Sequence, residues 1–255
     1  MFSVIIPTLQ RSSFLPDLLD GLHRMPEVGE IVVINNSDRP LAGASGLAKV
    51  RVLDQHRNIY VNPAWNLGVR EAKHDLICLC NDDVLVTGAT FRAAAARIRR
   101  GAGIVGASPM CLLSPEQTRA RLPPITVPTF LRPFGFGVFM CFARDAYRPI
   151  PDDLLIYWGD DYLFRRQDRL NYVLVGPCLT TRMSTTSGSP EFQPLKDADD
   201  LVVSQRYGED PYRLRHWRWY RAQRLLADLT SGLADIRSRF RRRPSSPAKQ
   251  HQGAR

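Results

Sequence analysis

The sequence lacks a long apolar run. No stretch approaches the roughly 18 consecutive apolar residues that a membrane-spanning helix needs, although 44% of the 255 residues are hydrophobic. The start, MFSVIIPTLQ, also lacks the basic region and cleavage pattern of a secretory signal. We therefore expect a β-strand at the start, and a sizeable core in one large domain or two small ones.

Cysteine is scarce as well. The five cysteines are scattered, with no CxxC pair and no cysteine–histidine cluster, which argues against a zinc site. Cys78 and Cys80 alternate in an apolar run, so both are expected to face the core as small residues. A reducing compartment is the simplest setting for such cysteines, and we predict a cytoplasmic protein.

Most of the chain has no excess of either charge. Residues 1–211 hold 23 basic and 23 acidic residues, whereas residues 212–255 hold 12 basic and two acidic residues. The net charge of +10 therefore belongs to the C-terminal end. Such a charge asymmetry indicates that the C-terminal end binds a partner, and it carries no information about the fold.

The basic end is predicted to contain a helix. Over residues 212–243, leucines and other apolar residues recur at helical spacing among arginines and tryptophans, while residues 244–255 are polar and predicted to be disordered. Three interpretations stay open. The apolar stripe can pack on the rest of the chain beneath a solvated basic face, the helix can lie on an anionic membrane surface, or it can bind nucleic acid.

Short apolar runs that end in polar residues predict a parallel sheet. Strands are expected at 3–7, 30–34, 50–53, 76–80 and 104–107, with helices at 12–22, 63–73 and 90–100. Continuous apolar strands in βαβ order indicate an α/β fold with a mostly parallel sheet and helices on both faces. Further along we expect a loop or flap at 109–135, a strand at 137–142, a helix at 163–170, a strand at 172–175 and a loop at 183–200.

Polar clusters fall where three of these strands end, at Pro7-Thr8, 35–38 and 81–83. Ligands of parallel sheets bind at this edge. Adjacent carboxylates such as Asp82 and Asp83 repel each other unless a cation or a donor lies between them, and hard divalent cations take carboxylate and phosphate oxygens. Taken alone, the Asn-Asp-Asp motif favours the simpler interpretation, a strand-to-turn boundary, where Asn and Asp are common.

A second acidic pair, Asp160 and Asp161, precedes an expected helix. A carboxylate in that position can cap the helix. It can also act as a general base for an acceptor hydroxyl, which loses its proton as it attacks a sugar carbon. Taken alone, the local pattern favours the cap.

Six segments, taken in order, resemble the family 2 glycosyltransferases, which are inverting enzymes of the GT-A fold. They are SVIIPTLQRSSFLPDLLDGL, EIVVINNSD, NIYVNPAWNLGVREAKHDLICLCNDDV, FGFGVFMCFARDAY, YWGDDYLFRR and SQRYG. The resemblance implies a GT-A nucleotide-sugar-binding domain at 1–210. The basic helical extension at 211–243 and the tail at 244–255 would follow it.

Carried over by position, the resemblance implies a role for each motif residue. Asp161 would be the catalytic base, with Asp160 beside it, and Asp83 would bind a divalent Mn²⁺ or Mg²⁺ that stabilises charge on the leaving diphosphate. Nucleotide-sugar binding would fall to Pro7, Thr8, Arg11, Asn35, Asn66, Asp82 and Arg182. Asn35 would meet the nucleobase, where the family usually has Asp. Arg182 would pair with the diphosphate, because 180–184 lacks the histidine with which many relatives bind the metal.

The sequence thus predicts a cytoplasmic or membrane-peripheral glycosyltransferase. It would move a sugar, with inversion, from a UDP- or TDP-linked donor to a hydroxyl of a glycan or lipid-linked acceptor. Two alternatives stand beside this prediction: an enzyme that glycosylates modified bases of DNA, and a catalytically inactive GT-A domain used for binding.

Overall fold

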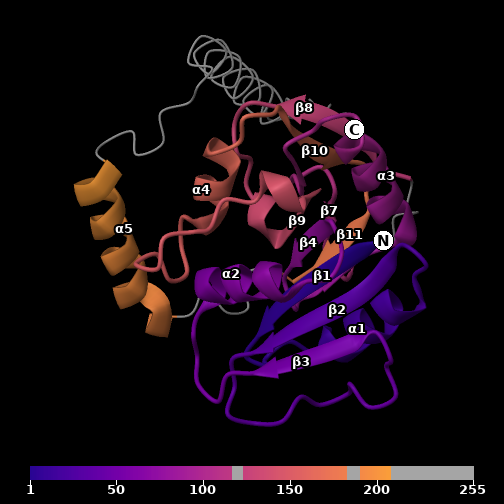
Figure 1. Ribbon diagram of the computed structural model, residues 1–255, viewed down its shortest axis with the longest axis horizontal. Helices are drawn as coiled ribbons and strands as arrows, with labels where there is room; N and C mark the ends of the chain where they lie inside the picture. The colour runs from indigo at the N-terminus through magenta and orange to yellow at the C-terminus, as the bar shows by residue number, and fades with distance from the viewer. Residues whose placement is uncertain (117–122, 183–189, 208–255) are drawn as a thin grey trace, which may run out of the picture. The chain divides into compact units, whose positions relative to one another are not determined.

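The computed structural model describes residues 1–116, 123–182 and 190–207 (Figure 1). Within them, an eight-stranded sheet has the order β3-β2-β1-β4-β9-β6-β10-β8, and a three-stranded sheet has the order β5-β11-β7. The strands are β1 (Phe2–Thr8), β2 (Val28–Asn35), β3 (Val50–Asp54), β4 (Leu76–Cys80), β5 (Val84–Leu85), β6 (Ile104–Gly106), β7 (Leu112–Leu113), β8 (Ile125–Thr129), β9 (Phe139–Ala143), β10 (Asn171–Val175) and β11 (Leu179–Thr181). The predicted basic helix at 212–243 and the tail at 244–255 lie outside the described residues.

Helices lie between these strands in the sequence or follow the last of them. They are α1 (Leu15–Arg24), α2 (Val61–Glu71), α3 (Gly88–Ile98), α4 (Gly159–Arg165) and α5 (Gln193–Tyr207), with short 3₁₀ turns η1 (Phe136–Val138), η2 (Arg144–Ala146) and η3 (Pro190–Phe192). None of the helices in the described ranges is long and apolar enough to cross a membrane.

The central strands of the main sheet are buried on both faces. Val4 and Ile6 of β1 pack in one apolar cluster with α1 and α3, while Ile5 between them packs in the other cluster with α2 and α4. Successive side chains of a strand point to opposite faces, so a strand covered on both sides must be apolar throughout. The prediction of a sheet with helices on both faces is confirmed (Figure 1).

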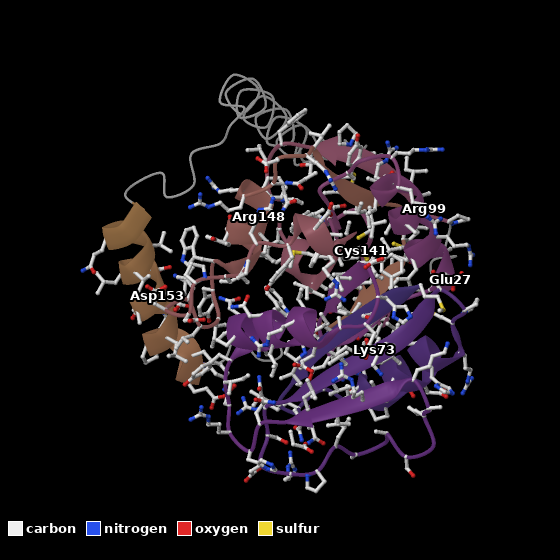
Figure 2. The ribbon with its side chains drawn as sticks, in the orientation of Figure 1. Glu27, Lys73, Arg99, Cys141, Arg148 and Asp153 are labelled. Atoms are coloured by element: carbon white, nitrogen blue, oxygen red, sulfur yellow. The ribbon has the colours of Figure 1, made fainter. Side chains whose placement is uncertain are left out.

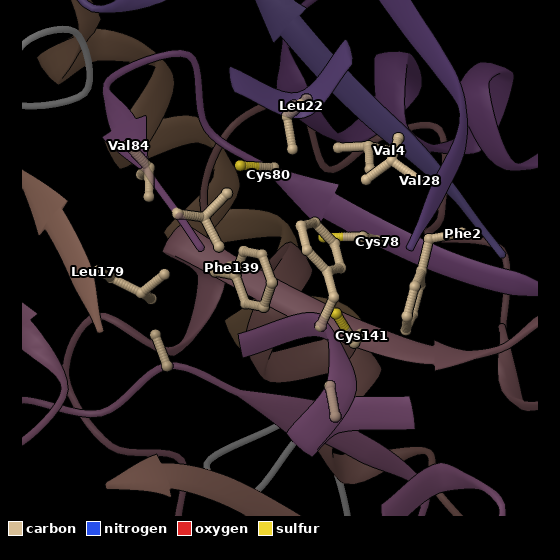
Figure 3. Packing of buried hydrophobic residues seen from close by; sticks show 14 of the residues in the cluster. Phe2, Val4, Leu22, Val28, Cys78, Cys80, Val84, Phe139, Cys141 and Leu179 are labelled. Atoms are coloured by element: carbon tan, nitrogen blue, oxygen red, sulfur yellow. The ribbon is translucent and has the colours of Figure 1, made fainter. Parts of the chain in front are cut away.

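One of these clusters contains the cysteines predicted to lie in the core. Cys78 and Cys80 are fully buried on β4, and Cys141 on β9 lies opposite Cys78 (Figure 3). Phe91 of α3 packs between Phe2 and Phe139, with ring centroids 5.1 and 5.5 Å apart. The cysteines of the described part of the chain are free thiols, and these three act as small apolar residues.

Three regions differ from the sequence prediction. The segment 109–135 contains the short strands β7 and β8. Strand β8 forms because it pairs with β10 in antiparallel orientation. Residues 193–200 belong to helix α5 and not to a loop, and α4 begins at Gly159, four residues before the expected start. Strands β3, β2, β1 and β4 are parallel, but β9 runs antiparallel between β4 and β6.

Candidate active site

A cavity of about 720 Å³ opens at the carboxyl ends of β1 and β4. This volume is within the range of small-molecule sites. Its walls come from several elements: Pro7, Thr8 and Leu9 at the end of β1; Asn36 after β2; Asn81, Asp82 and Asp83 after β4; Asn58, Tyr60, Val61 and Trp65 at the start of α2; Arg132, Phe134, Gly135, Gly137 and Val138 before β9; Ile156, Tyr157, Trp158, Asp160, Asp161 and Arg165 around α4; and Phe192, Lys196 and Asp200 of η3 and α5. Parallel strands end at one edge of the sheet, so residues distant in sequence meet there.

Asp82 and Asp83 form the acidic wall of this cavity. The hydroxyl of Thr8 donates to Asp82 Oδ2 at 2.5 Å, and the side chain of Asp83 is buried. The pKa of Asp82 is raised to about 6, chiefly by burial; the hydrogen bond from Thr8 lowers this pKa and the neighbouring charge of Asp83 raises it. The site therefore holds two desolvated carboxylates that a positive ligand would stabilise.

These carboxylates suit a divalent cation that is shared with a phosphate group. Within the described ranges, no group of three or more His, Cys, Asp or Glu residues is placed to hold a metal ion. The protein side of such a site is then the pair Asp82 and Asp83. Hard cations such as Mg²⁺ commonly use one or two carboxylates and complete their coordination with phosphate oxygens and water, so this donor set fits the implied cofactor.

Asn35 and its neighbour Asn36 are placed differently. The Asn35 amide donates to Asp54 Oδ1 and to the Arg39 carbonyl, both at 2.7 Å, and its Oδ1 accepts from the Ser37 hydroxyl at 2.8 Å. These bonds hold the turn after β2, and Asn35 does not line the cavity. Asn36 does line it.

Two polar atoms of uncharged side chains on the cavity wall are buried and have no hydrogen-bond partner among the described residues. They are Oδ1 of Asn36 and the indole Nε1 of Trp65. Asn36 and Trp65 are 5% and 4% exposed, so water does little to compensate them. The cavity wall thus offers one acceptor after β2 and one donor on α2.

Arg11, Asn66 and Arg182 are not among the residues that line the cavity. Arg11 forms an ion pair with Glu191 and lies over the Phe192 ring. Asn66 Oδ1 accepts from the Tyr147 hydroxyl at 2.7 Å, and its amide donates to the Ile150 carbonyl at 2.8 Å. Arg182 is exposed, with its guanidinium 5.2 Å from the centroid of Phe14. Their roles in donor binding stay predictions.

The second acidic pair faces the same cavity from α4. Arg132 lies against both carboxylates, with its Nε 2.7 Å from Asp161 Oδ2 and its Nη1 3.2 Å from Asp160 Oδ2. Arg165 follows Asp161 by one helical turn, with its Nε 3.9 Å from Asp161 Oδ1. Burial raises the pKa of Asp160, and Arg132 opposes this rise. Arg132 therefore offsets the repulsion between two neighbouring acids.

The backbone around this pair is tightly constrained. Trp158, at the start of α4, has φ 64° and ψ −4°, a left-handed conformation that costs a bulky residue about 1–3 kcal/mol. A Cβ on Gly137 would lie 2.9 Å from Asp160 Oδ2, and one on Gly159 would lie 2.0 Å from Asn62 Oδ1. Both positions need glycine because the carboxylate and the amide approach the backbone closely.

Sequence reasoning missed several residues of this site. Arg132 lies in the proline-rich segment expected to be a loop or flap, and Lys196 and Asp200 lie on a helix expected to be a loop. Only Arg165 carried a local signal, since it follows Asp161 by four residues on a helix. The structure does place Pro7, Thr8, Asp82, Asp83, Asp160 and Asp161 around one cavity.

The fold resembles known structures of S. aureus TarS. The TarS 1-349 structure superposes with a TM-score of 0.55 at 15% identity, covering 80% of this chain and 65% of that chain. The structure of TarS 1-349 in complex with UDP-GlcNAc gives 0.55 at 16% identity, covering 80% and 66%. This chain thus spans less than two thirds of either, and identity at this level shows the fold alone.

The sequence itself matches a family model. The model described as "Glycosyl transferase family 2" matches residues 3–169, which is more than half of the chain. No curated protein matches the sequence. On the family model and the GT-A fold, the chain belongs to glycosyl transferase family 2.

Proposed function

We propose that the chain transfers a sugar from a nucleoside-diphosphate sugar to an acceptor hydroxyl with inversion at the anomeric carbon. The observation that carries this proposal is the cavity that gathers two acidic pairs on its walls, Asp82 with Asp83 and Asp160 with Asp161. The pair after β4 suits the diphosphate end of a donor, and the pair on α4 suits a base near the acceptor.

In the proposed reaction, the acceptor oxygen attacks the anomeric carbon while the bond from that carbon to the diphosphate oxygen breaks. The proton of the acceptor hydroxyl passes to a carboxylate oxygen of Asp161. Asp83 and Asp82 would hold a divalent cation, which supplies charge stabilisation for the leaving diphosphate. Asn36 and Trp65 offer an unused acceptor and donor for a polar group of the nucleotide.

The proposed donor is a UDP-linked sugar. TarS, which shares the fold, has been crystallised with UDP-GlcNAc and with UDP. The proposed acceptor is an uncharged hydroxyl of a glycan or lipid-linked sugar. On the α4 and α5 walls, the carboxylates of Asp160, Asp161 and Asp200 are paired with the cations of Arg132, Arg165 and Lys196. A wall with balanced charge suits a neutral acceptor better than a polyanion such as DNA.

Donor binding is tested by calorimetric titration of UDP, TDP and GDP, with and without Mn²⁺. We expect metal-dependent binding of UDP to the wild type and a loss of at least about tenfold in affinity for Asp83→Ala, because a ligand of the cation is removed. Binding that does not need a metal ion would contradict the metal part of the proposal. Failure of every nucleotide to bind would contradict the donor class.

The role of Asp161 is tested by turnover of UDP-GlcNAc with sugar acceptors. Asp161→Asn keeps the shape of the side chain but removes its ability to take a proton. We expect the turnover rate to fall by about 10²-fold or more, with UDP affinity unchanged. The matched control is Asp152→Asn, an exposed acid just before α4, which is expected to behave as wild type. Full activity of Asp161→Asn would rule out this base.

A further inference from the structure

The loop that leads into α4 is held by helix α5. Asp199 of α5 is 1% exposed, and its carboxylate accepts three consecutive backbone N–H groups. Leu155 donates to Oδ1 at 3.1 Å, while Ile156 and Tyr157 donate to Oδ2 at 2.9 and 2.8 Å. Figure 2 labels Asp153, which comes two residues before this hydrogen-bonded segment. Successive N–H groups that converge in this way form a concave site for one anion.

The same loop is held from the other side by α2. The amide of Asn62 donates to the carbonyls of Leu154 and Tyr157 at 3.2 and 3.1 Å, and the backbone N–H of Asn62 donates to the Leu155 carbonyl at 3.0 Å. Asn62 is fully buried. The loop is therefore fixed between acceptors on α5 and donors on α2, although neither helix is adjacent to it in sequence.

The residue that follows this loop belongs to the cavity. The indole Nε1 of Trp158 donates to Asp200 Oδ1 at 2.6 Å, and the other oxygen of Asp200 pairs with Lys196 at 2.6 Å. Trp158, Lys196 and Asp200 all line the cavity. Asp160 and Asp161 come two and three residues after Trp158, so the position of the loop sets where α4 starts.

We propose that Asp199 is a positioning residue for the reaction. Its carboxylate fixes the 155–157 backbone, which keeps Trp158 in its left-handed conformation and sets Asp160 and Asp161 against the acceptor. This inference rests on the proposed function, because it assigns Asp199 a role in that chemistry. A buried carboxylate needs several hydrogen bonds to offset its desolvation, and here the backbone supplies three of them.

An amide side chain cannot replace this arrangement. Asparagine at position 199 has one acceptor oxygen, and its NH₂ group would face a backbone N–H where the second carboxylate oxygen now accepts. The variant Asp199→Asn therefore changes little in size but loses one or two of the three bonds. Its matched control is Asp197→Asn on the same helix, where the side chain is exposed and accepts from Gln193 at 2.8 Å.

The first test measures the loop without any substrate. In Asp199→Asn we expect amide hydrogen exchange at residues 155–157 to be about tenfold faster or more. We also expect the indole ¹H–¹⁵N signal of Trp158, assigned with Trp158→Phe, to shift while that of Trp65 stays in place. Asp197→Asn should match the wild type in both measurements. Unchanged exchange and an unchanged Trp158 signal would overturn the proposal.

The second test measures the chemistry. We expect Asp199→Asn to lower turnover of UDP-GlcNAc by about 10- to 100-fold, since a small displacement of a catalytic group has effects of this size, and to leave UDP affinity unchanged. If UDP affinity falls as much as turnover, Asp199 only stabilises the fold. The same holds if the variant unfolds at a lower temperature than the wild type but keeps full turnover below that temperature. Absence of UDP binding by the wild type would count against the proposed function, while the exchange result would still decide whether Asp199 holds the loop.

A second variant covers the case in which Asp199→Asn does not fold. Asp200→Asn changes a side chain that is 38% exposed and weakens the bond from Trp158. It should shift the Trp158 indole signal and lower turnover without changing UDP affinity. If Asp200→Asn moves the indole signal and leaves turnover unchanged, the loop does not position the reacting groups and the proposal is wrong.

Discussion

The pKa of Asp82 makes the stability of the chain depend on pH in a way that can be calculated. Burial raises this pKa from 3.8 to about 6 in the folded chain. Because the folded state holds the proton more tightly, protonation of Asp82 stabilises the fold fully below about pH 4, and this contribution is lost as the pH rises through about 6. The difference in pKa corresponds to about 3 kcal/mol in total.

The perturbation is Asp82→Asn, which leaves a neutral side chain at every pH. The amide oxygen of the substituted side chain can still accept from the Thr8 hydroxyl, so the hydrogen bond at this position is retained. At about pH 7.5 the variant should be more stable than the wild type by up to about 3 kcal/mol. At about pH 4.5 the advantage should shrink to about 1 kcal/mol, since the wild-type carboxyl is then mostly protonated.

The assay is urea unfolding at both pH values with EDTA present. The matched control is Asp38→Asn, an exposed acid after β2, whose stability should stay within about 0.5 kcal/mol of the wild type at each pH. With Mn²⁺ added near pH 7.5, the stability advantage of Asp82→Asn over the wild type should shrink, because the proposed cation stabilises the ionised carboxylate. An advantage of Asp82→Asn that is constant, or that grows as the pH falls, would refute the reasoning.

Three further predictions concern single substitutions, two of them on the α4 side of the cavity and one in α1. Arg132→Met removes the cation that opposes the raised pKa of Asp160, so turnover should fall and the acidic limb of the pH–rate profile should move to higher pH. The control is Arg166→Met, at an exposed position. A pH–rate profile of Arg132→Met identical to that of the wild type would contradict this role. Gly137→Ala places a Cβ 2.9 Å from Asp160 Oδ2 and should lower turnover more than UDP affinity. Gly21→Ala in α1, where the Cβ meets nothing within 4 Å, should instead stabilise the fold by about 0.5–1 kcal/mol in a urea titration.

Much of the fold could be predicted from local sequence. Strands covered on both faces must be apolar throughout, and this composition marked β1, β2 and β4 without any tertiary information. The same rule placed the polar residues that follow them at one edge of the sheet, where Thr8, Asp82 and Asp83 now line the cavity. Periodicity also marked α1, because Leu15, Leu18, Leu19 and Leu22 share one buried face.

Local sequence was least informative where long-range contacts decide the structure. Strand β8 includes Pro128 and lies in a proline-rich segment, yet it forms because β10 offers a free edge. Helix α5 has a weak apolar pattern, and its buried Asp199 accepts its hydrogen bonds from the distant 155–157 backbone. Neither contact has a signature in the residues around it.

For the active site, the sequence alone determined which residue types stand at the carboxyl ends of strands and at the start of α4. Those positions follow from the rule that parallel strands end together. Only the tertiary structure decided that Asn36 and not Asn35 faces the cavity, that Arg132 joins Asp160 and Asp161, and that α5 holds the loop before them. The physical reason is that a side chain's partners depend on which distant backbone lies beside it.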